Sequence, residues 1–167
     1  MLLQTVVTGL AIGGIYALMA VGYSLVFSVL NFSNFAYGAI IMLGAYVGYY
    51  TLALFGQPFP VALATSILGA AFLAFLNEKI AYASLRARRA PALYFMISAM
   101  GTAIFLENLV YATIGSHFYA YPEIFKAKGL NLLGSSIGIL DVFALIFSVL
   151  GISCLHYFLS STTLALA

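Results

Sequence analysis

The stretch that decides the fold is residues 9–46, which read GLAIGGIYALMAVGYSLVFSVLNFSNFAYGAIIMLGAY. It contains no Asp, Glu, Lys or Arg, and outward from it the chain stays free of these residues from position 1 to position 77. One crossing of about 30 Å of hydrocarbon needs only about 20 apolar residues. Three crossings therefore fit into this uncharged region, and its expected solvent is lipid rather than water.

The composition of the whole chain agrees with a membrane location. Of 167 residues, 65% are hydrophobic and 6% are charged, whereas a soluble domain carries roughly 25% charged residues. These values exclude a water-soluble enzyme and a nucleic-acid-binding domain, and a single cysteine excludes a disulfide-stapled domain. We therefore predict an all-α, polytopic transmembrane helical bundle that forms a single transmembrane domain over residues 1–167.

Apolar runs predict about five membrane segments. They cover residues 2–30, 36–56, 60–77, 92–114 and 139–159.

The connections between these runs set the expected orientation. Residues 78–91 are predicted to form a basic loop, and residues 115–138 a longer loop on the opposite side. The first loop holds Lys79, Arg86, Arg88 and Arg89, so the positive-inside rule places it in the cytoplasm. Three crossings before this loop put the N-terminus outside, and the fifth crossing puts the C-terminus in the cytoplasm.

The polar sequence Asn31-Phe32-Ser33-Asn34 interrupts the first two apolar runs. One interpretation is a capped turn at the membrane face. The other is a broken or re-entrant helix near residues 31–38, whose freed backbone groups line a cavity. In this second interpretation the candidates for lining a substrate path are Asn31, Ser33, Asn34 and Gly38.

Small residues at helical spacing predict faces where helices pack closely. The first run contains Gly9-xxx-Gly13, continued one turn later by Ala17, and the second contains Gly44-xxx-Gly48. The second run also ends in a cluster of aromatic side chains, which fits either an aromatic belt at the outer membrane interface or a packed core. The cluster comprises Tyr46, Tyr49, Tyr50, Phe55 and Phe59.

The fourth run carries a carboxylate and several neutral polar side chains. Glu107 is an intramembrane charge, and either a transport-path role or a structural or interfacial role fits it. At 100° per residue, Ser98, Thr102 and Asn108 fall on one helical face, roughly opposite Glu107. These three residues form a second set of path candidates.

No catalytic or metal-binding pattern accompanies these polar residues. The sequence has no phosphate-binding loop, no metal-ligand pair and no nucleophile elbow. We therefore predict no enzyme activity, no cofactor and no metal, and any ATP hydrolysis belongs to another subunit.

The opening stretch resembles the start of the branched-chain amino acid ABC-importer permeases. The family pattern G-x-x-x-G-x-x-Y-A-L-x-A-x-G is met from Gly9 to Gly22, followed by the turn Asn34–Gly38 and by Met42-Leu43-Gly44-Ala45-Tyr46. Tyr37 stands where the family usually has His. The segments Ile97–Gly101 and Phe105–Asn108 extend the resemblance along the chain.

The resemblance implies a permease subunit that moves branched-chain or related amino acids across a bacterial or archaeal cytoplasmic (inner) membrane. It also implies a second permease subunit, cytoplasmic ATP-binding subunits and an extracytoplasmic solute-binding protein as partners, besides the lipid bilayer. Family permeases are roughly twice as long, so the C-terminal half with its coupling loop is expected to be absent here. The alternatives are a non-transporting truncated fragment or assembly element, or a permease for another small amide or urea-like solute.

Overall fold

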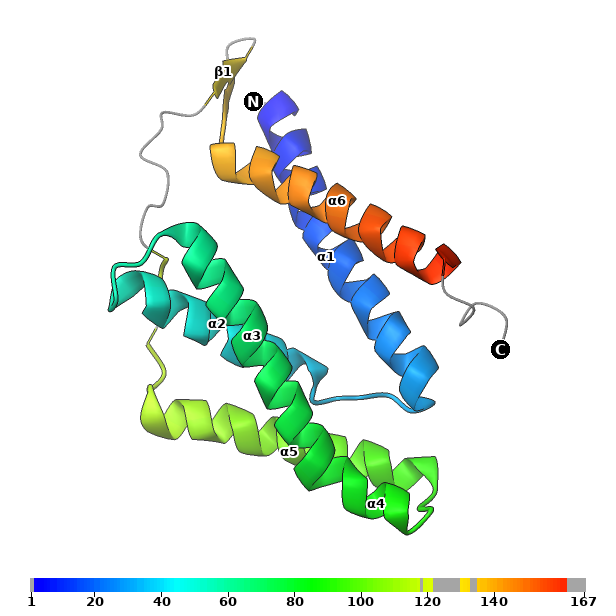
Figure 1. Ribbon diagram of the computed structural model, residues 1–167. Helices are drawn as coiled ribbons and strands as arrows, with labels where there is room; N and C mark the ends of the chain where they lie inside the picture. The colour runs from blue at the N-terminus through cyan, green and yellow to red at the C-terminus, as the bar shows by residue number, and fades with distance from the viewer. Residues whose placement is uncertain (1, 118, 122–129, 133–134, 162–167) are drawn as a thin grey trace. The chain divides into compact units, whose positions relative to one another are not determined.

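The computed structural model describes residues 2–117, 119–121, 130–132 and 135–161, and its main elements are helices (Figure 1). In chain order the elements are α1 (Leu2–Leu30), α2 (Tyr37–Ala53), α3 (Phe59–Asn77), the π-helical turn η1 (Glu78–Tyr82), α4 (Ala83–Ala87), α5 (Ala92–Thr113), β1 (Leu130–Leu132), β2 (Ser135–Ile137) and α6 (Ile139–Ser161).

The prediction of a helical, polytopic membrane fold is confirmed. Among the described residues, four helical stretches are long and apolar enough to cross a membrane: Gln4–Leu30, Phe59–Ala87, Ala92–Thr113 and Ile139–Tyr157. The fifth apolar helix, α2, has 17 residues. At 1.5 Å per residue it is about 25 Å long, somewhat shorter than the hydrocarbon core.

The prediction of a loop over residues 78–91 is wrong for most of that range. The chain continues from α3 through η1 and α4 as far as Ala87, and only the turn from Arg88 to Pro91 is irregular. Glu, Lys and Arg are good helix formers, and Pro91 is the first helix breaker in this region. An ion pair of 2.7 Å between Arg86 and Glu78 lies along the helical extension. The charges therefore mark a polar helix end rather than a loop.

A second difference lies in the predicted loop over residues 115–138. Strands β1 and β2 form an antiparallel pair there, in which Leu130 is opposite Ile137 and Leu132 is opposite Ser135. The pair is short, and it adds a small hairpin to an otherwise helical protein.

The described residues form two compact units. In the unit that comprises residues up to Leu25 and those from Phe125 onward, α1 packs against α6. A Cβ at Gly14 would lie 3.0 Å from the Cβ of Ser148, and one at Gly151 would lie 2.9 Å from Leu18. The Thr8 hydroxyl donates a 2.7 Å hydrogen bond to the Asp141 carboxylate. Small residues on both helices thus permit this close approach.

The other unit, Val26–Ile124, is built on the pairing of α2 with α3. A Cβ at Gly44 would lie 2.9 Å from the Cβ of Ala70, and one at Gly48 would lie 3.2 Å from Ser66. The Ser66 hydroxyl donates a 2.7 Å hydrogen bond to the Gly44 carbonyl. Gly44 and Gly48 therefore lie directly in a helix–helix contact.

The small residues singled out on α1 have different surroundings. Among the described residues nothing lies within 4 Å of where a Cβ would be at Gly9 or Gly13. Ala17 is exposed. The close contact of α1 is made instead by Gly14.

Candidate functional site

The predicted break between the first two helices is present at residues 31–36. Helix α1 ends where Asn31 takes a left-handed φ of 57°, a conformation that Asn tolerates better than most residues. Its backbone N–H still donates to the Phe27 carbonyl at 2.8 Å. Helix α2 begins at Tyr37, whose N–H donates to the Asn34 carbonyl at 3.2 Å.

The Asn34 side chain organises this break. It is 8% exposed. Its Oδ1 accepts one hydrogen bond from the Ala36 N–H at 3.1 Å and another from the Tyr82 hydroxyl at 2.7 Å. A buried amide oxygen is costly unless it is hydrogen-bonded. Asn34 therefore fixes the backbone of the break and also ties it to η1.

An aromatic cluster surrounds this polar contact. The Phe32 ring lies edge-on to Tyr82, with centroids 5.3 Å apart, and 5.0 Å from the ring of Phe95 on α5. Tyr82 is 2% exposed, and the neighbouring Ala99 is fully buried. We call Phe32, Asn34, Tyr82, Phe95 and Ala99 the break cluster, and it joins the break, η1 and α5 into one packed region.

A buried polar atom adjoins the cluster at the start of η1. Asn77 is 8% exposed, and its Oδ1 has no hydrogen-bond partner among the described residues. The π-helical turn follows immediately, from Glu78 to Tyr82. Such turns interrupt the regular α-helical hydrogen-bonding pattern and occur frequently at functional sites.

The four path candidates near the break differ in their surroundings. Asn31 and Gly38 are exposed, Ser33 is half-buried and Asn34 is buried. Sequence reasoning missed Tyr82, the partner of Asn34, because it placed this residue in a loop. No local pattern links two residues 48 positions apart.

The polar candidates on α5 all bond to backbone carbonyls. Ser98 donates to the Ala81 carbonyl of η1 at 3.2 Å. Thr102 donates to Ser98 at 3.0 Å, and the Asn108 amide donates to Ile104 at 2.7 Å, both within the helix. Of these three, only Ser98 reaches another element.

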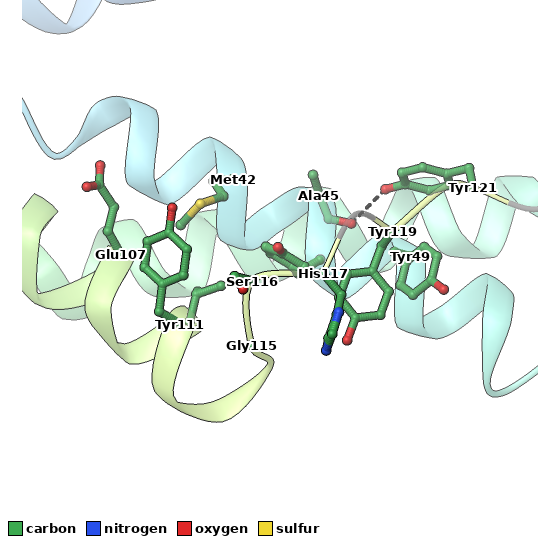
Figure 2. Close-up of a pocket in the computed structure, with 12 residues that line it drawn as sticks. Met42, Ala45, Tyr49, Glu107, Tyr111, Gly115, Ser116, His117, Tyr119 and Tyr121 are labelled. Carbon is green, nitrogen blue, oxygen red and sulfur yellow. Dashed lines mark hydrogen bonds between the residues drawn. The ribbon is translucent and has the colours of Figure 1, made fainter.

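Glu107 lies elsewhere, in a cavity of about 700 Å³ between α2, the end of α5 and the segment that follows α5 (Figure 2). Gly115 lets this segment turn away from α5, because its φ of 89° suits glycine alone. The Tyr121 hydroxyl donates to the Ala45 carbonyl of α2 at 2.6 Å and so closes one wall. Partial burial raises the pKa of the Tyr121 phenol above its ordinary value.

The fold and the buried break define a class, a multi-pass helical membrane protein with an irregular segment packed inside it. The family described as branched-chain amino acid transport system / permease component matches residues 5–164. The chain therefore belongs to this family of transport permeases.

Three curated relatives are each 34% identical to this chain. They are the high-affinity branched-chain amino acid transport system permease proteins LivH of Salmonella typhimurium (142 residues; 80% of this chain, 45% of LivH), LivH of Escherichia coli K12 (134 residues; 75% and 43%) and BraD of Pseudomonas aeruginosa (130 residues; 73% and 42%). The chain thus spans less than half the length of these relatives. No solved structure matches it significantly.

Proposed function

We propose that this chain supplies membrane helices of an ABC-importer permease that moves branched-chain amino acids across the cytoplasmic membrane. Family membership and four span-length apolar helices support a transport role. The observation that carries the proposal is the break at residues 31–36, buried through Phe32, Asn34 and Ala36. Irregular backbone at membrane depth is tolerated only where protein covers it or water fills a cavity, and transporters bind solutes at such breaks.

The break divides its polar residues between two roles. Asn34 is a positioning residue, because both hydrogen bonds to its Oδ1 come from the protein itself. Asn31, Ser33 and Gly38 are the members that offer accessible polar or backbone groups to a passing solute. Ser98, Thr102 and Asn108 form the second set, in which Ser98 is closest to the break through its contact with η1.

The proposed partners follow from the family. A second permease subunit completes the path, cytoplasmic ATP-binding subunits supply the energy, and an extracytoplasmic protein delivers the solute. ATP hydrolysis takes place on those separate subunits. We place Arg86, Arg88 and Arg89 on the cytoplasmic side and the N-terminus outside.

Uptake measurements on the assembled system test the function. Vesicles that contain this chain together with the second permease subunit, the ATP-binding subunits and the solute-binding protein should take up labelled leucine when ATP is supplied. Ser33→Ala and Asn31→Ala should each lower the uptake rate at least tenfold, with co-purification of the ATP-binding subunit unchanged. Gln57→Ala is the matched control, since Gln57 is an exposed polar residue after α2. Assembly without leucine uptake by the unaltered chain would contradict the proposal.

Cysteine labelling tests the orientation and the short helix α2. After Cys154→Ala, cysteines introduced at Gln4 and at Arg88, both exposed, are labelled with an impermeant maleimide. Three crossings lie between these positions if α2 spans the membrane, so only opposite-side labelling fits. Labelling from the same side would show that α2 enters and leaves on one face.

A further inference from the structure

The cavity beside Glu107 has a tyrosine-rich lining that the transport proposal does not use. The Tyr49 ring makes edge contacts with Tyr119 and Tyr121, with interplanar angles of 62° and 88° and ring centroids 5.3 and 5.6 Å away. Tyr46 makes a similar contact with Tyr119 at 6.2 Å. All four rings line the same cavity, which we call the tyrosine pocket.

Tyrosine rings make walls that suit a positively charged group. An aromatic face carries partial negative charge, and a cation within about 6 Å of the ring centroid is attracted to it. Several tyrosine rings around one space are the arrangement that proteins use to bind alkylated ammonium groups. The edge-to-face contacts also hold these rings in place before any ligand arrives.

Charge in the pocket points to the same class of ligand. Glu107 contributes a carboxylate to the lining, and no Lys or Arg does so among the described residues. Glu107 and Tyr111 lie at one end of the pocket, and Tyr49, Tyr119 and Tyr121 lie at the other (Figure 2). His117 also lines the pocket, and a solute that enters meets the carboxylate and a tyrosine ring at one end and tyrosine rings at the other.

Size and polarity set the remaining limits on the ligand. The volume of about 700 Å³ falls in the range of small-molecule sites. Met42 and Val110 add apolar surface to the lining. A zwitterionic amino acid fits this lining less well than an amine, because its carboxylate would be repelled by Glu107.

We propose that the tyrosine pocket binds an alkylammonium group at the end where the Glu107 carboxylate and the Tyr111 ring lie, while the tyrosines at the other end line the space for the rest of the ligand. The group belongs either to a free organic amine or to the headgroup of a membrane lipid. This site goes beyond the leucine path near Asn34, because its lining selects a net positive charge.

Met42 provides a reporter within the pocket. The 167-residue chain, carrying ¹³C-methyl methionine, is purified in a maltoside detergent, and the Met42 signal is assigned with Met42→Leu. Isoamylamine is then titrated against isoamyl alcohol, which has the same carbon skeleton without the charge. We expect the amine to shift the Met42 signal saturably, at a concentration at least tenfold below that of the alcohol. The signal of Met100, which is exposed on α5 and outside the pocket, should not move.

Variants of exposed lining residues separate the contribution of the carboxylate charge to amine binding from that of the aromatic ring. Glu107→Gln should weaken amine binding about tenfold, while Thr113→Val, an exposed control on α5 outside the pocket lining, should leave it unchanged. Tyr111→Leu should weaken it severalfold, and Tyr111→Phe, which keeps the ring, should not. Far-UV circular dichroism verifies the helical content of each variant. Equal binding of amine and alcohol, or full binding by Glu107→Gln, would overturn the proposal.

Nanodiscs distinguish the two sources of the ammonium group. With phosphatidylglycerol alone, isoamylamine should bind as in detergent. If a lipid headgroup occupies the site, adding phosphatidylethanolamine should shift the Met42 signal without any amine and should weaken the binding of isoamylamine. If phosphatidylethanolamine has neither effect, the ligand is a free amine. Leucine uptake by the assembled system is measured separately. Failure of amine binding therefore does not contradict the transport proposal, and failure of leucine uptake does not contradict the amine site.

Discussion

The break cluster and the tyrosine pocket both contain tyrosines, but the tyrosine side chains lie in opposite surroundings. At the break, Tyr82 is 2% exposed, and its hydroxyl is bonded to a buried amide. In the pocket, Tyr119 and Tyr121 are 39% and 47% exposed, and their rings border an open cavity. In the first arrangement the hydroxyl is used within the protein, whereas in the second the rings line a cavity.

The hydrogen bonds in the two regions differ in what their loss would leave behind. Tyr82 donates to Asn34, a side chain with little access to solvent. Tyr121 donates to the Ala45 carbonyl from an exposed position, where another donor can replace it. A buried group left without a partner costs more than an exposed one. Stability should therefore depend strongly on the break cluster and weakly on the pocket.

Among these substitutions, Asn34→Ala should lower the free energy of unfolding the most. It removes the acceptor of both the Tyr82 hydroxyl and the Ala36 N–H, so the variant should lose about 3 kcal/mol of unfolding free energy. The measurement is unfolding by increasing mole fraction of dodecyl sulfate in mixed micelles, followed by circular dichroism.

Asn31→Ala is the control for this prediction, because Asn31 lies in the same break but is exposed. Its loss should be about 1 kcal/mol, because Ala fits the left-handed conformation at position 31 less well than Asn does. Equal losses for Asn31 and Asn34 would show that the buried amide does not organise the break.

Gly44→Val should have the next largest effect. A Cβ at Gly44 already meets Ala70 at 2.9 Å, so a branched side chain must separate α2 from α3, at a cost of about 2 kcal/mol. Because α2 connects the break to the pocket, this substitution tests whether both regions need the same helix pair. The shift in unfolding midpoint is compared with that of Gly38→Val, where nothing lies within 4 Å among the described residues.

The sequence alone was enough to predict the elements whose cause is local. The long uncharged runs predict apolar helices, and Asn31, Ser33 and Asn34 mark the break between two of them. Short-range rules failed at residues 78–87, where charge suggested a loop although residues 78–90 contain no Gly or Pro. Charged side chains can be solvated at a membrane face while their backbone stays helical, as at this polar helix end.

The composition of the two sites could not be predicted, because each depends on partners distant in the chain. Tyr82 meets Asn34 across 48 positions, and Tyr121 meets Ala45 across 76. The helical wheel of α5 did place Glu107 roughly opposite Ser98, Thr102 and Asn108. It gave no sign that the segment after Gly115 returns to α2 and encloses a cavity.

Tyr82→Phe should have a smaller effect than loss of Asn34. The ring contacts with Phe32 and Phe95 are kept, and Asn34 retains its hydrogen bond from Ala36. The expected loss is about 1 kcal/mol in the same micelle titration. A loss as large as that of Asn34→Ala would mean that the Ala36 contact contributes little.

Tyr121→Phe should have the smallest effect, below about 0.5 kcal/mol, because the lost hydrogen bond is exposed and Ala45 lies within a helix. Its ring contact with Tyr49 is kept. Hydrogen exchange at residues 115–121 should nevertheless increase, since this bond attaches the segment to α2. Unchanged exchange here would mean that ring packing alone holds the pocket wall, whereas a stability loss equal to that of Tyr82→Phe would remove the distinction between the two regions.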